Sequence, residues 1–257
     1  MFPVLYSFGN IQFHTYGASL FVSLMVIYFL ARRATPGSLL TLDHIDDLML
    51  IIIISLWLGG GIIHLLFSAF SGTWNWQDLF DIQTLQQFSV FPVALATTLA
   101  MALWCRWKKL PLTGVIDFLI PFLTLGYGLH RILGCFNAGC CYGTPTSLPW
   151  GVVFPPHPGH AEGPPAGIAL HPTQIYLGLS AFLTWWFLHR FKDALRHPGA
   201  RTAAGLAGLS GSYFIIAFVR DHPGHALGYN ESLFHELLSF IIAAITISIT
   251  FRRWNRN

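Results

Sequence analysis

Seven long apolar runs take up most of this sequence and constrain its fold more than any other feature. A helix that crosses the hydrocarbon core of a bilayer needs about 20 mostly apolar residues. The runs cover residues 16–31, 48–70, 90–105, 114–133, 172–188, 202–219 and 232–251. Only 10% of the 257 residues are charged, against about a quarter in soluble domains. The sequence therefore predicts a single all-α integral membrane domain over 1–257, with about seven transmembrane helices.

The basic residues gather on one side of these predicted helices. Of the 14 Lys and Arg residues, those that follow the first, third, fifth and seventh runs are Arg32, Arg33, Arg106, Lys108, Lys109, Arg190, Lys192, Arg196, Arg201, Arg252, Arg253 and Arg256. Basic residues flank membrane helices on the cytoplasmic side. We therefore expect a cytoplasmic C-terminus and an N-terminus outside.

Two arginines fall on the outer side against this rule. Arg131 lies at the outer end of the fourth run, and Arg220 at the outer end of the sixth. Each could be an interface anchor whose guanidinium reaches the lipid phosphates. Alternatively, both could bind one anionic substrate, because a guanidinium offers a phosphate two parallel hydrogen bonds.

The longest connection, at about 134–171, lies on the predicted outer side and is rich in Gly and Pro. It contains Cys135, Cys140 and Cys141, and the pentapeptide HPGHA occurs in it at 157–161 and again at 222–226. These residues leave open a transition-metal site, a disulfide from Cys135 to one of the adjacent cysteines, or free thiols. We expect no metal, because a tight site needs preoriented ligands and the two pentapeptides lie in separate, glycine-containing connections.

Several motifs resemble those of the prolipoprotein diacylglyceryl transferases of bacterial inner membranes. HRILGCFNAGCCYG at 130–143 resembles the family signature, and HPTQIY at 171–176 matches the motif that opens a later span. The signature positions that agree are Arg131, Gly134, Phe136, Gly139, Tyr142 and Gly143. Weaker matches, in the same order along the chain, are HTYG at 14–17, WLGGGIIHLLF at 57–67, DFLIPF at 117–122, LPWGVVFP at 148–155 and FVR at 218–220.

The sequence also departs from the family pattern. Phe91 stands where the family has a catalytic His in the third span, and one extra residue lies between Arg131 and Phe136. Cys135 and Cys140 replace an Asn and a Glu of the signature. In the sixth span, Tyr213 and Ala217 replace an Arg and a Glu. The sequence therefore resembles a divergent, cysteine-bearing branch of the family.

The resemblance implies an enzyme that moves the diacylglyceryl group of phosphatidylglycerol to the cysteine thiol of a prolipoprotein and releases glycerol phosphate. Its partners would be phosphatidylglycerol, the prolipoprotein signal peptide and the lipid bilayer, with no nucleic acid and no cofactor. It would be a multi-pass protein of the bacterial inner (plasma) membrane. The alternatives are a protein of the same fold with a changed acceptor, or a metal- or thiol-handling membrane protein.

The resemblance also assigns site residues. Arg131 and Arg220 would hold the departing phosphate, and His130 or His171 would be the catalytic base, with the pair His235 and Glu236 as a further possibility. The substrate-binding candidates are Tyr16, Gly143, Gln174, Tyr176, Cys135, Cys140 and Glu236. No metal ligand is expected among them.

Overall fold

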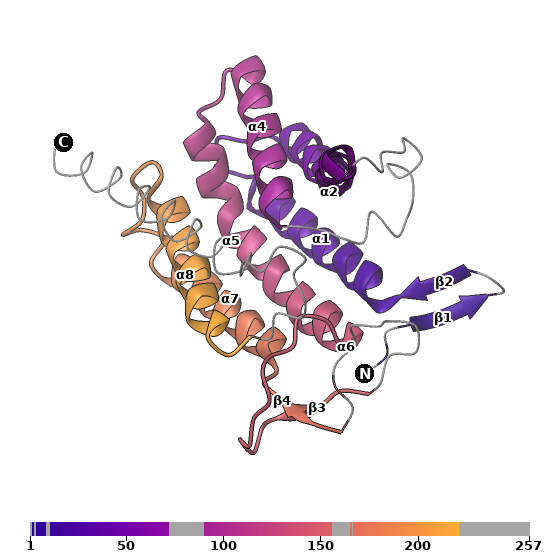
Figure 1. The fold of residues 1–257 in the computed structure, drawn as a ribbon. Helices are drawn as coiled ribbons and strands as arrows, with labels where there is room; N and C mark the ends of the chain where they lie inside the picture. Colours follow the sequence, from indigo (N-terminus) through magenta and orange to yellow (C-terminus); the bar gives the residue numbers. More distant parts are fainter. Residues whose placement is uncertain are drawn as a thin grey trace. The chain divides into compact units, whose positions relative to one another are not determined.

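The computed structural model describes residues 2, 4–8, 11–71, 90–155, 165 and 167–220, with side chains at these positions apart from 11–12, 57–71, 90–92 and 94–95. Helices make up most of the described chain (Figure 1). The elements are β1 Val4–Phe8, β2 Ile11–His14, α1 Thr15–Ala34, α2 Leu42–Ser71, α4 Val90–Lys108, α5 Leu112–His130, η2 Arg131–Cys135, α6 Phe136–Ala138, β3 Val152–Val153, β4 Ala169–Leu170, α7 Thr173–Arg190 and α8 Ala200–Ala217.

The predicted apolar runs agree with the helices. The first six coincide with α1, α2, α4, α5 with η2, α7 and α8, while the seventh, at 232–251, lies outside the described residues. Two described helices, Thr15–Ala34 and Leu112–Ala138, are long and apolar enough to cross a membrane, with mean hydropathies of 1.4 and 1.6. The predicted helical class is confirmed, whereas the number of spans and their orientation stay predictions.

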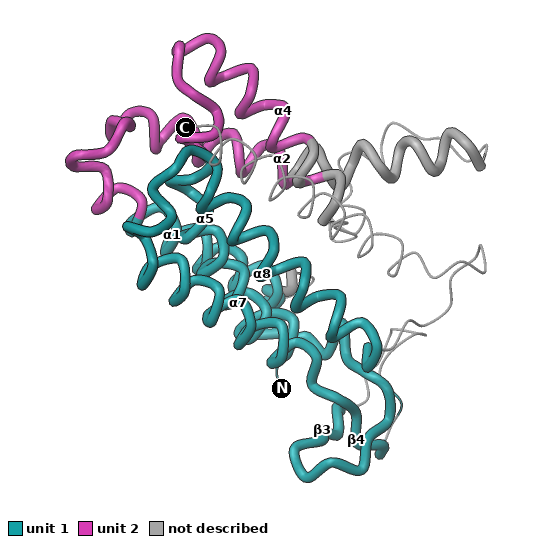
Figure 2. The backbone as a smooth tube through the Cα atoms, turned by 90° about the vertical axis from the view of Figure 1, so that its left-hand side faces the viewer, with its two compact units in different colours: residues 1–30, 116–257 teal, residues 31–115 magenta. Residues whose placement is uncertain are grey.

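The chain divides into two compact units (Figure 2). The first comprises Met1–Leu30 and Ile116–Asn257, and the second comprises Ala31–Val115. In the second unit, α2 packs on α4, and Asp47 joins the two helices. Its carboxylate accepts hydrogen bonds from Lys108 Nζ at 3.0 Å and Trp104 Nε1 at 3.1 Å. The Lys108 hydrogen bond lowers the pKa of Asp47, so this link is made by a carboxylate anion.

The first unit begins with a β-hairpin that the sequence did not predict. β1 and β2 pair antiparallel, with Val4 opposite His14 and Phe8 opposite Ile11. Leu5, Tyr6 and Phe8 are all largely exposed. Because apolar residues occupy both faces of β1, the strand lacks the polar–apolar alternation by which a half-buried strand is recognised.

The helix that contains Arg131 ends later than the sequence predicted. We expected the outer connection to begin at 134, but the helix continues through η2 and α6 and ends at Gly139, whose φ is 68°. η2 is a π-helical turn, in which the Phe136 N–H donates to the carbonyl of Arg131 five residues earlier. This wider turn accommodates the extra residue between Arg131 and Phe136 without ending the helix.

Glycines bring α5 and α7 into close contact. A Cβ atom on Gly128 would lie 3.1 Å from the carbonyl oxygen of Gly178, and one on Gly178 would lie 3.3 Å from that of Gly128. Small residues allow such backbone approach between membrane helices. The contact continues between α7 and η2, so it places the π-helical turn beside the start of α7.

Asp117 of α5 caps the N-terminus of α8. Its Oδ1 accepts hydrogen bonds from the Thr202 backbone N–H at 2.8 Å and the Thr202 hydroxyl at 2.6 Å, and its Oδ2 accepts from the Gly199 N–H. The first N–H groups of a helix have no partner within the helix, and they favour a nearby negative charge. A carboxylate from a neighbouring helix therefore fixes where α8 begins.

Replacing Asp117 should destabilise the first unit. We expect Asp117→Ala to lower the free energy of unfolding by about 1–2 kcal/mol, which is typical of losing a side-chain helix cap. Thermal unfolding in detergent, followed by circular dichroism, measures the change. The exposed Asp43, in the first turn of α2, is the matched control, and Asp43→Ala should stay within about 0.5 kcal/mol of the parent. Equal effects of the two substitutions would contradict the capping role.

Candidate active site

The π-helical turn η2 holds Arg131 in a buried position. The residue is 6% exposed, and its guanidinium carbon lies 4.9 Å from the ring centroid of Tyr127, one helical turn earlier. Its Nη1 lies 3.8 Å from the sulfur of Cys135. The Nε atom has no hydrogen-bond partner among the described residues. A buried guanidinium with an unused donor is prepared to bind an anion.

A backbone bridge brings Arg220 to the same region. Gly143 pairs with Arg220, and the Thr144 N–H donates to the Val219 carbonyl at 2.9 Å. The Arg220 guanidinium donates to the hydroxyl of Tyr213 and lies 5.2 Å from its ring centroid. The end of α8 is thereby joined to the connection that follows α6.

The two guanidiniums converge. Arg131 and Arg220 both interact electrostatically with Tyr213 and with Cys141, and each is close enough to repel the other. Two positive groups in one region of the fold, one at the turn that follows α5 and the other at the end of α8, form a local positive potential. The two arginines that the sequence analysis singled out therefore lie in the same region of the structure.

The thiols of Cys135, Cys140 and Cys141 lie beside these arginines. All three are free; the Cys140 thiol lies 3.6 Å from the Cys135 carbonyl oxygen, and Arg131 Nη1 lies 3.8 Å from the Cys135 sulfur. The Cys135 and Cys140 thiols lower the pKa of Cys141 despite its desolvation, and the guanidiniums of Arg131 and Arg220 lower it further. Within the described ranges, no group of three or more His, Cys, Asp or Glu side chains is arranged to hold a metal ion.

His130, the residue before Arg131, is held in place by α1. Its Nδ1 lies 2.9 Å from the Ser19 hydroxyl, and its ring makes an edge contact with Tyr16 at 4.5 Å between centroids. A Cβ atom on Gly134 would collide with the Ser19 hydroxyl and lie 2.9 Å from His130 Nδ1. A glycine at position 134 is therefore required for α1 to approach this turn so closely.

His171 and Gly143 lie in the short ladder that leads into α7. The Gly143 N–H donates to the His171 carbonyl at 2.8 Å, and the His171 N–H donates to the Thr144 carbonyl at 3.0 Å. A Cβ atom on Gly143 would lie 2.6 Å from the Cβ of His171 and would collide with the Val219 carbonyl. No larger residue fits between these two strands of chain.

The first turn of α7 holds the two adjacent cysteines in place. Gln174 is fully buried, and its Nε2 donates to the Cys140 carbonyl at 2.6 Å, while the Thr173 hydroxyl donates to the Cys141 carbonyl. The Gln174 Oε1 atom has no hydrogen-bond partner among the described residues. It is therefore a second buried polar atom that is available to a bound molecule.

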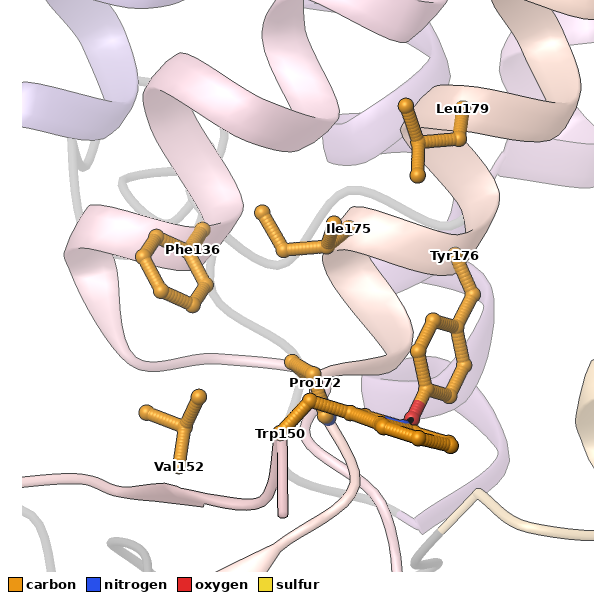
Figure 3. A pocket seen from close by; sticks show the side chains of 7 residues that line it. All are labelled: Phe136, Trp150, Val152, Pro172, Ile175, Tyr176 and Leu179. Carbon is orange, nitrogen blue, oxygen red and sulfur yellow. Dashed lines mark hydrogen bonds between the residues drawn. The ribbon is translucent and has the colours of Figure 1, made fainter. Parts of the chain in front are cut away.

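Tyr176 borders an apolar pocket, shown in Figure 3. Its hydroxyl accepts a hydrogen bond from Trp150 Nε1 at 2.8 Å and lies 3.2 Å from His171 Nδ1. The cavity has a volume of about 430 Å³ and is lined by Phe136, Trp150, Val152, Pro172, Ile175, Tyr176 and Leu179. Beside it, β3 and β4 cover a buried cluster of Tyr142, Phe154 and Leu170.

Residues 3–252 match the family model described as prolipoprotein diacylglyceryl transferase. The chain belongs to this family. Similar proteins named phosphatidylglycerol–prolipoprotein diacylglyceryl transferase include one from Clostridium tetani, 28% identical over 97% of this chain and 98% of that protein. The one from Xanthomonas campestris pv. campestris strain B100 is 30% identical over 95% of this chain and 88% of that protein. The one from Vibrio vulnificus strain YJ016 is 32% identical over 88% of this chain and 81% of that protein.

Most of the candidate residues of this family member are thus grouped. One group lies around the end of η2 and consists of Tyr16, His130, Arg131, Cys135, Cys140 and Arg220. The other lies at the adjoining start of α7 and consists of Gly143, His171, Gln174 and Tyr176. His235 and Glu236 lie outside the described residues, as do both HPGHA segments. Phe91 lies in the first turn of α4, and its side chain is not described.

Sequence reasoning missed four side chains that support the site. These are Ser19, Tyr127, Trp150 and Tyr213. Tyr127 precedes Arg131 by one turn of the same helix, a spacing that predicts a side-chain contact. Tyr213 was noted as a departure from the family pattern, and its hydroxyl now contacts Arg220, so this position still belongs to the arginine cluster.

Proposed function

We propose that this chain transfers the diacylglyceryl group of phosphatidylglycerol to the cysteine thiol of a prolipoprotein and releases glycerol phosphate. Membership of the family and the names of the similar proteins support this reaction. The observation that carries it in the structure is the buried Arg131, with its unpartnered Nε, in the region to which the Gly143–Arg220 bridge brings Arg220. The acceptor attacks a glyceryl carbon while a phosphate ester leaves, and the leaving group gains negative charge during this step.

Arg131 and Arg220 would hold that phosphate. Oriented donors aimed at a developing anion, in a site that excludes water, are among the largest contributions to catalysis. The Nε of Arg131 would donate to a phosphate oxygen, and the aromatic rings of Tyr127 and Tyr213 would keep the two guanidiniums in position. Gln174 and Tyr16 would contact the remaining polar groups of the lipid, and the pocket beside Tyr176 would provide an apolar wall.

His130 would be the base that removes the proton from the acceptor thiol. The Ser19 hydroxyl donates its proton to the Tyr16 carbonyl at 2.8 Å, so its oxygen must accept from His130 Nδ1–H. That arrangement leaves the other ring nitrogen, Nε2, unprotonated and able to accept a proton. His171 is a less suitable base, because the Tyr176 hydroxyl, which accepts from Trp150 Nε1, can donate its own proton to His171 Nδ1, and the ring proton then occupies Nε2.

The enzyme would be a multi-pass protein of the bacterial inner membrane with seven spans, its N-terminus outside and its C-terminus in the cytoplasm. The six described helices at predicted spans and the distribution of basic residues support this topology. The site residues then lie toward the outer face. The departing glycerol phosphate would be released on that side.

The phosphate role of the arginines predicts a large loss of turnover. Arg131→Gln and Arg220→Gln should each lower kcat by about two to three orders of magnitude, or roughly 3–4 kcal/mol. The assay follows diacylglyceryl transfer from phosphatidylglycerol to a synthetic signal peptide in proteoliposomes. The exposed Arg190 at the end of α7 is the control, and Arg190→Gln should retain full activity. Normal turnover in either site variant, with normal insertion, would make that arginine an interface anchor.

The base role of His130 predicts a separate effect. We expect His130→Gln to lower kcat by about 10²- to 10⁴-fold and to leave the KM for phosphatidylglycerol nearly unchanged, because the lost group acts on the acceptor thiol. Raising the assay pH should restore part of the activity, since a larger fraction of the acceptor is then thiolate. His189→Gln, at the exposed end of α7, is the matched control. A change confined to KM would assign His130 to lipid binding.

Reporter fusions test the orientation. We expect a fusion at Ser71 to report the outer side and a fusion at Arg196 to report the cytoplasm, because three predicted spans, an odd number, lie between these positions. Alkaline phosphatase and green fluorescent protein serve as complementary reporters, active outside and inside respectively. Both positions on one side would contradict the seven-span arrangement.

A further inference from the structure

Gln174, in the first turn of α7, keeps one buried atom without a partner. Its side chain is fully buried, and its amide nitrogen, Nε2, donates to the Cys140 carbonyl at 2.6 Å. A carbonyl only accepts hydrogen bonds, so this contact fixes which end of the amide is the nitrogen. The amide oxygen, Oε1, meets no hydrogen-bond donor in the part of the chain that the structure describes. A buried acceptor without a donor is costly, so this atom is prepared for a donor that a ligand brings.

Three contacts join this amide to the guanidinium of Arg131. Arg131 Nη1 lies 3.8 Å from the Cys135 sulfur. The Cys135 carbonyl accepts from the Cys140 N–H at 3.2 Å, and the Cys140 carbonyl accepts from Gln174. The amide and the guanidinium are therefore parts of one connected site.

The packing of α7 supports the same placement. Gly178 follows Gln174 by four residues and so lies on the same face of α7. A Cβ atom on Gly178 would lie 2.5 Å from Cγ1 of Ile132, the residue after Arg131. The face of α7 that carries Gln174 is thus packed against the turn that carries Arg131.

The two unpartnered buried atoms of this site differ in character. Arg131 Nε is a donor, whereas Gln174 Oε1 is an acceptor. An ionised phosphodiester offers only acceptors, so it can satisfy Arg131 Nε but not Gln174 Oε1. A ligand that satisfies both must carry an O–H or N–H group close to its phosphate.

The charge of the site favours a neutral donor. An ammonium group would be repelled by the guanidiniums of Arg131 and Arg220, whereas a hydroxyl group would not. The headgroup of phosphatidylglycerol carries hydroxyls on the second and third carbons from the phosphate ester oxygen. A phosphate held by the arginines therefore brings neutral donors with it.

We propose that Gln174 selects the glycerol headgroup of the lipid, because its Oε1 accepts a hydrogen bond from a headgroup hydroxyl. The inference rests on the proposed function, in which Arg131 and Arg220 hold the phosphate. It adds a residue that distinguishes phosphatidylglycerol from other anionic phospholipids. A site built to hydrogen-bond a substrate hydroxyl discriminates against an analogue that lacks it, because the buried partner is then left unpaired.

Two lipids test the inference on the unaltered enzyme. Phosphatidylglycerol and phosphatidylpropanol both have three-carbon headgroups, but the second has no headgroup hydroxyl. The assay measures kcat/KM for diacylglyceryl transfer from each lipid to a synthetic signal peptide in proteoliposomes. We expect a preference of about 10- to 100-fold for phosphatidylglycerol, as for one buried acceptor left unpaired. Equal values for the two lipids would overturn the inference.

Two variants assign the preference to the Gln174 acceptor. Gln174→Met keeps a side chain of similar length without the acceptor, and it should abolish most of the preference. The matched control is Thr173→Val, because the Thr173 hydroxyl donates to the neighbouring Cys141 carbonyl as Gln174 donates to the Cys140 carbonyl. Thr173→Val should change transfer from the two lipids by the same factor and keep the preference.

The variants also show which results would contradict the assignment. A preference that survives Gln174→Met, or one that Thr173→Val removes, would mean that the Gln174 acceptor does not read the headgroup. If Gln174→Met raised only the KM for the peptide, the donor would be a backbone N–H of the prolipoprotein, and the headgroup role would be rejected.

Binding of free headgroups separates this inference from the proposed reaction. Glycerol 1-phosphate and propyl phosphate are titrated into the full-length protein in detergent by calorimetry. We expect tighter binding of glycerol 1-phosphate by the unaltered protein, and no such difference in Gln174→Met. That result in protein that transfers no lipid would keep the headgroup role and reject the proposed function. Equal binding of both phosphates, with equal use of both lipids, would reject the headgroup role and leave the transfer reaction standing.

Discussion

The site depends on a backbone ladder of a few hydrogen bonds. Gly143 and Thr144 pair with His171 on one side and with the Val219–Arg220 segment on the other. These bonds join the turn after α6, the start of α7 and the end of α8, three segments that are distant along the chain. Because backbone groups buried without a partner are costly, the ladder fixes the register of all three segments. The positions of Arg220 and His171 relative to Arg131 follow from that register.

The same arrangement places two like charges side by side in a poorly solvated region, which costs free energy. Tyr127 and Tyr213 offset part of this cost by presenting their ring faces to the guanidiniums, and the neighbouring thiols add hydrogen-bonding and charge partners. The carboxylate ion pairs of Arg32 and Lys108 lie in the other compact unit. The ring of Tyr127 beside Arg131 and that of Tyr213 beside Arg220 are contacts that leave a guanidinium able to bind a phosphate.

The sequence predicted the helices and the arginine pair for physical reasons that do not depend on detailed packing. Long apolar runs need lipid or a deep core, and basic residues on the wrong side need a counterion. The end of the Arg131 helix was placed too early, because Gly134 allows close helix contact whereas Gly139 is the residue with a left-handed backbone. The contact of Tyr127 with Arg131 could have been inferred from their spacing of one helical turn. The role of Tyr213 could not be predicted, since aromatic residues are common in membrane helices and their partners depend on the tertiary fold.

The cap on α8 has a consequence for the order of biogenesis. Asp117 lies 82 residues before Gly199, so it is synthesised and placed in its helix well before the N–H groups that it binds exist. Until then, the half-buried carboxylate must be satisfied by water or by lipid headgroups. The arrival of α8 removes that temporary solvation and locks α5 at the same time. Assembly of the two helices is therefore coupled through one carboxylate. In a nascent chain that stalls before residue 199, Asp117 of α5 would still lack its hydrogen-bond partners from α8.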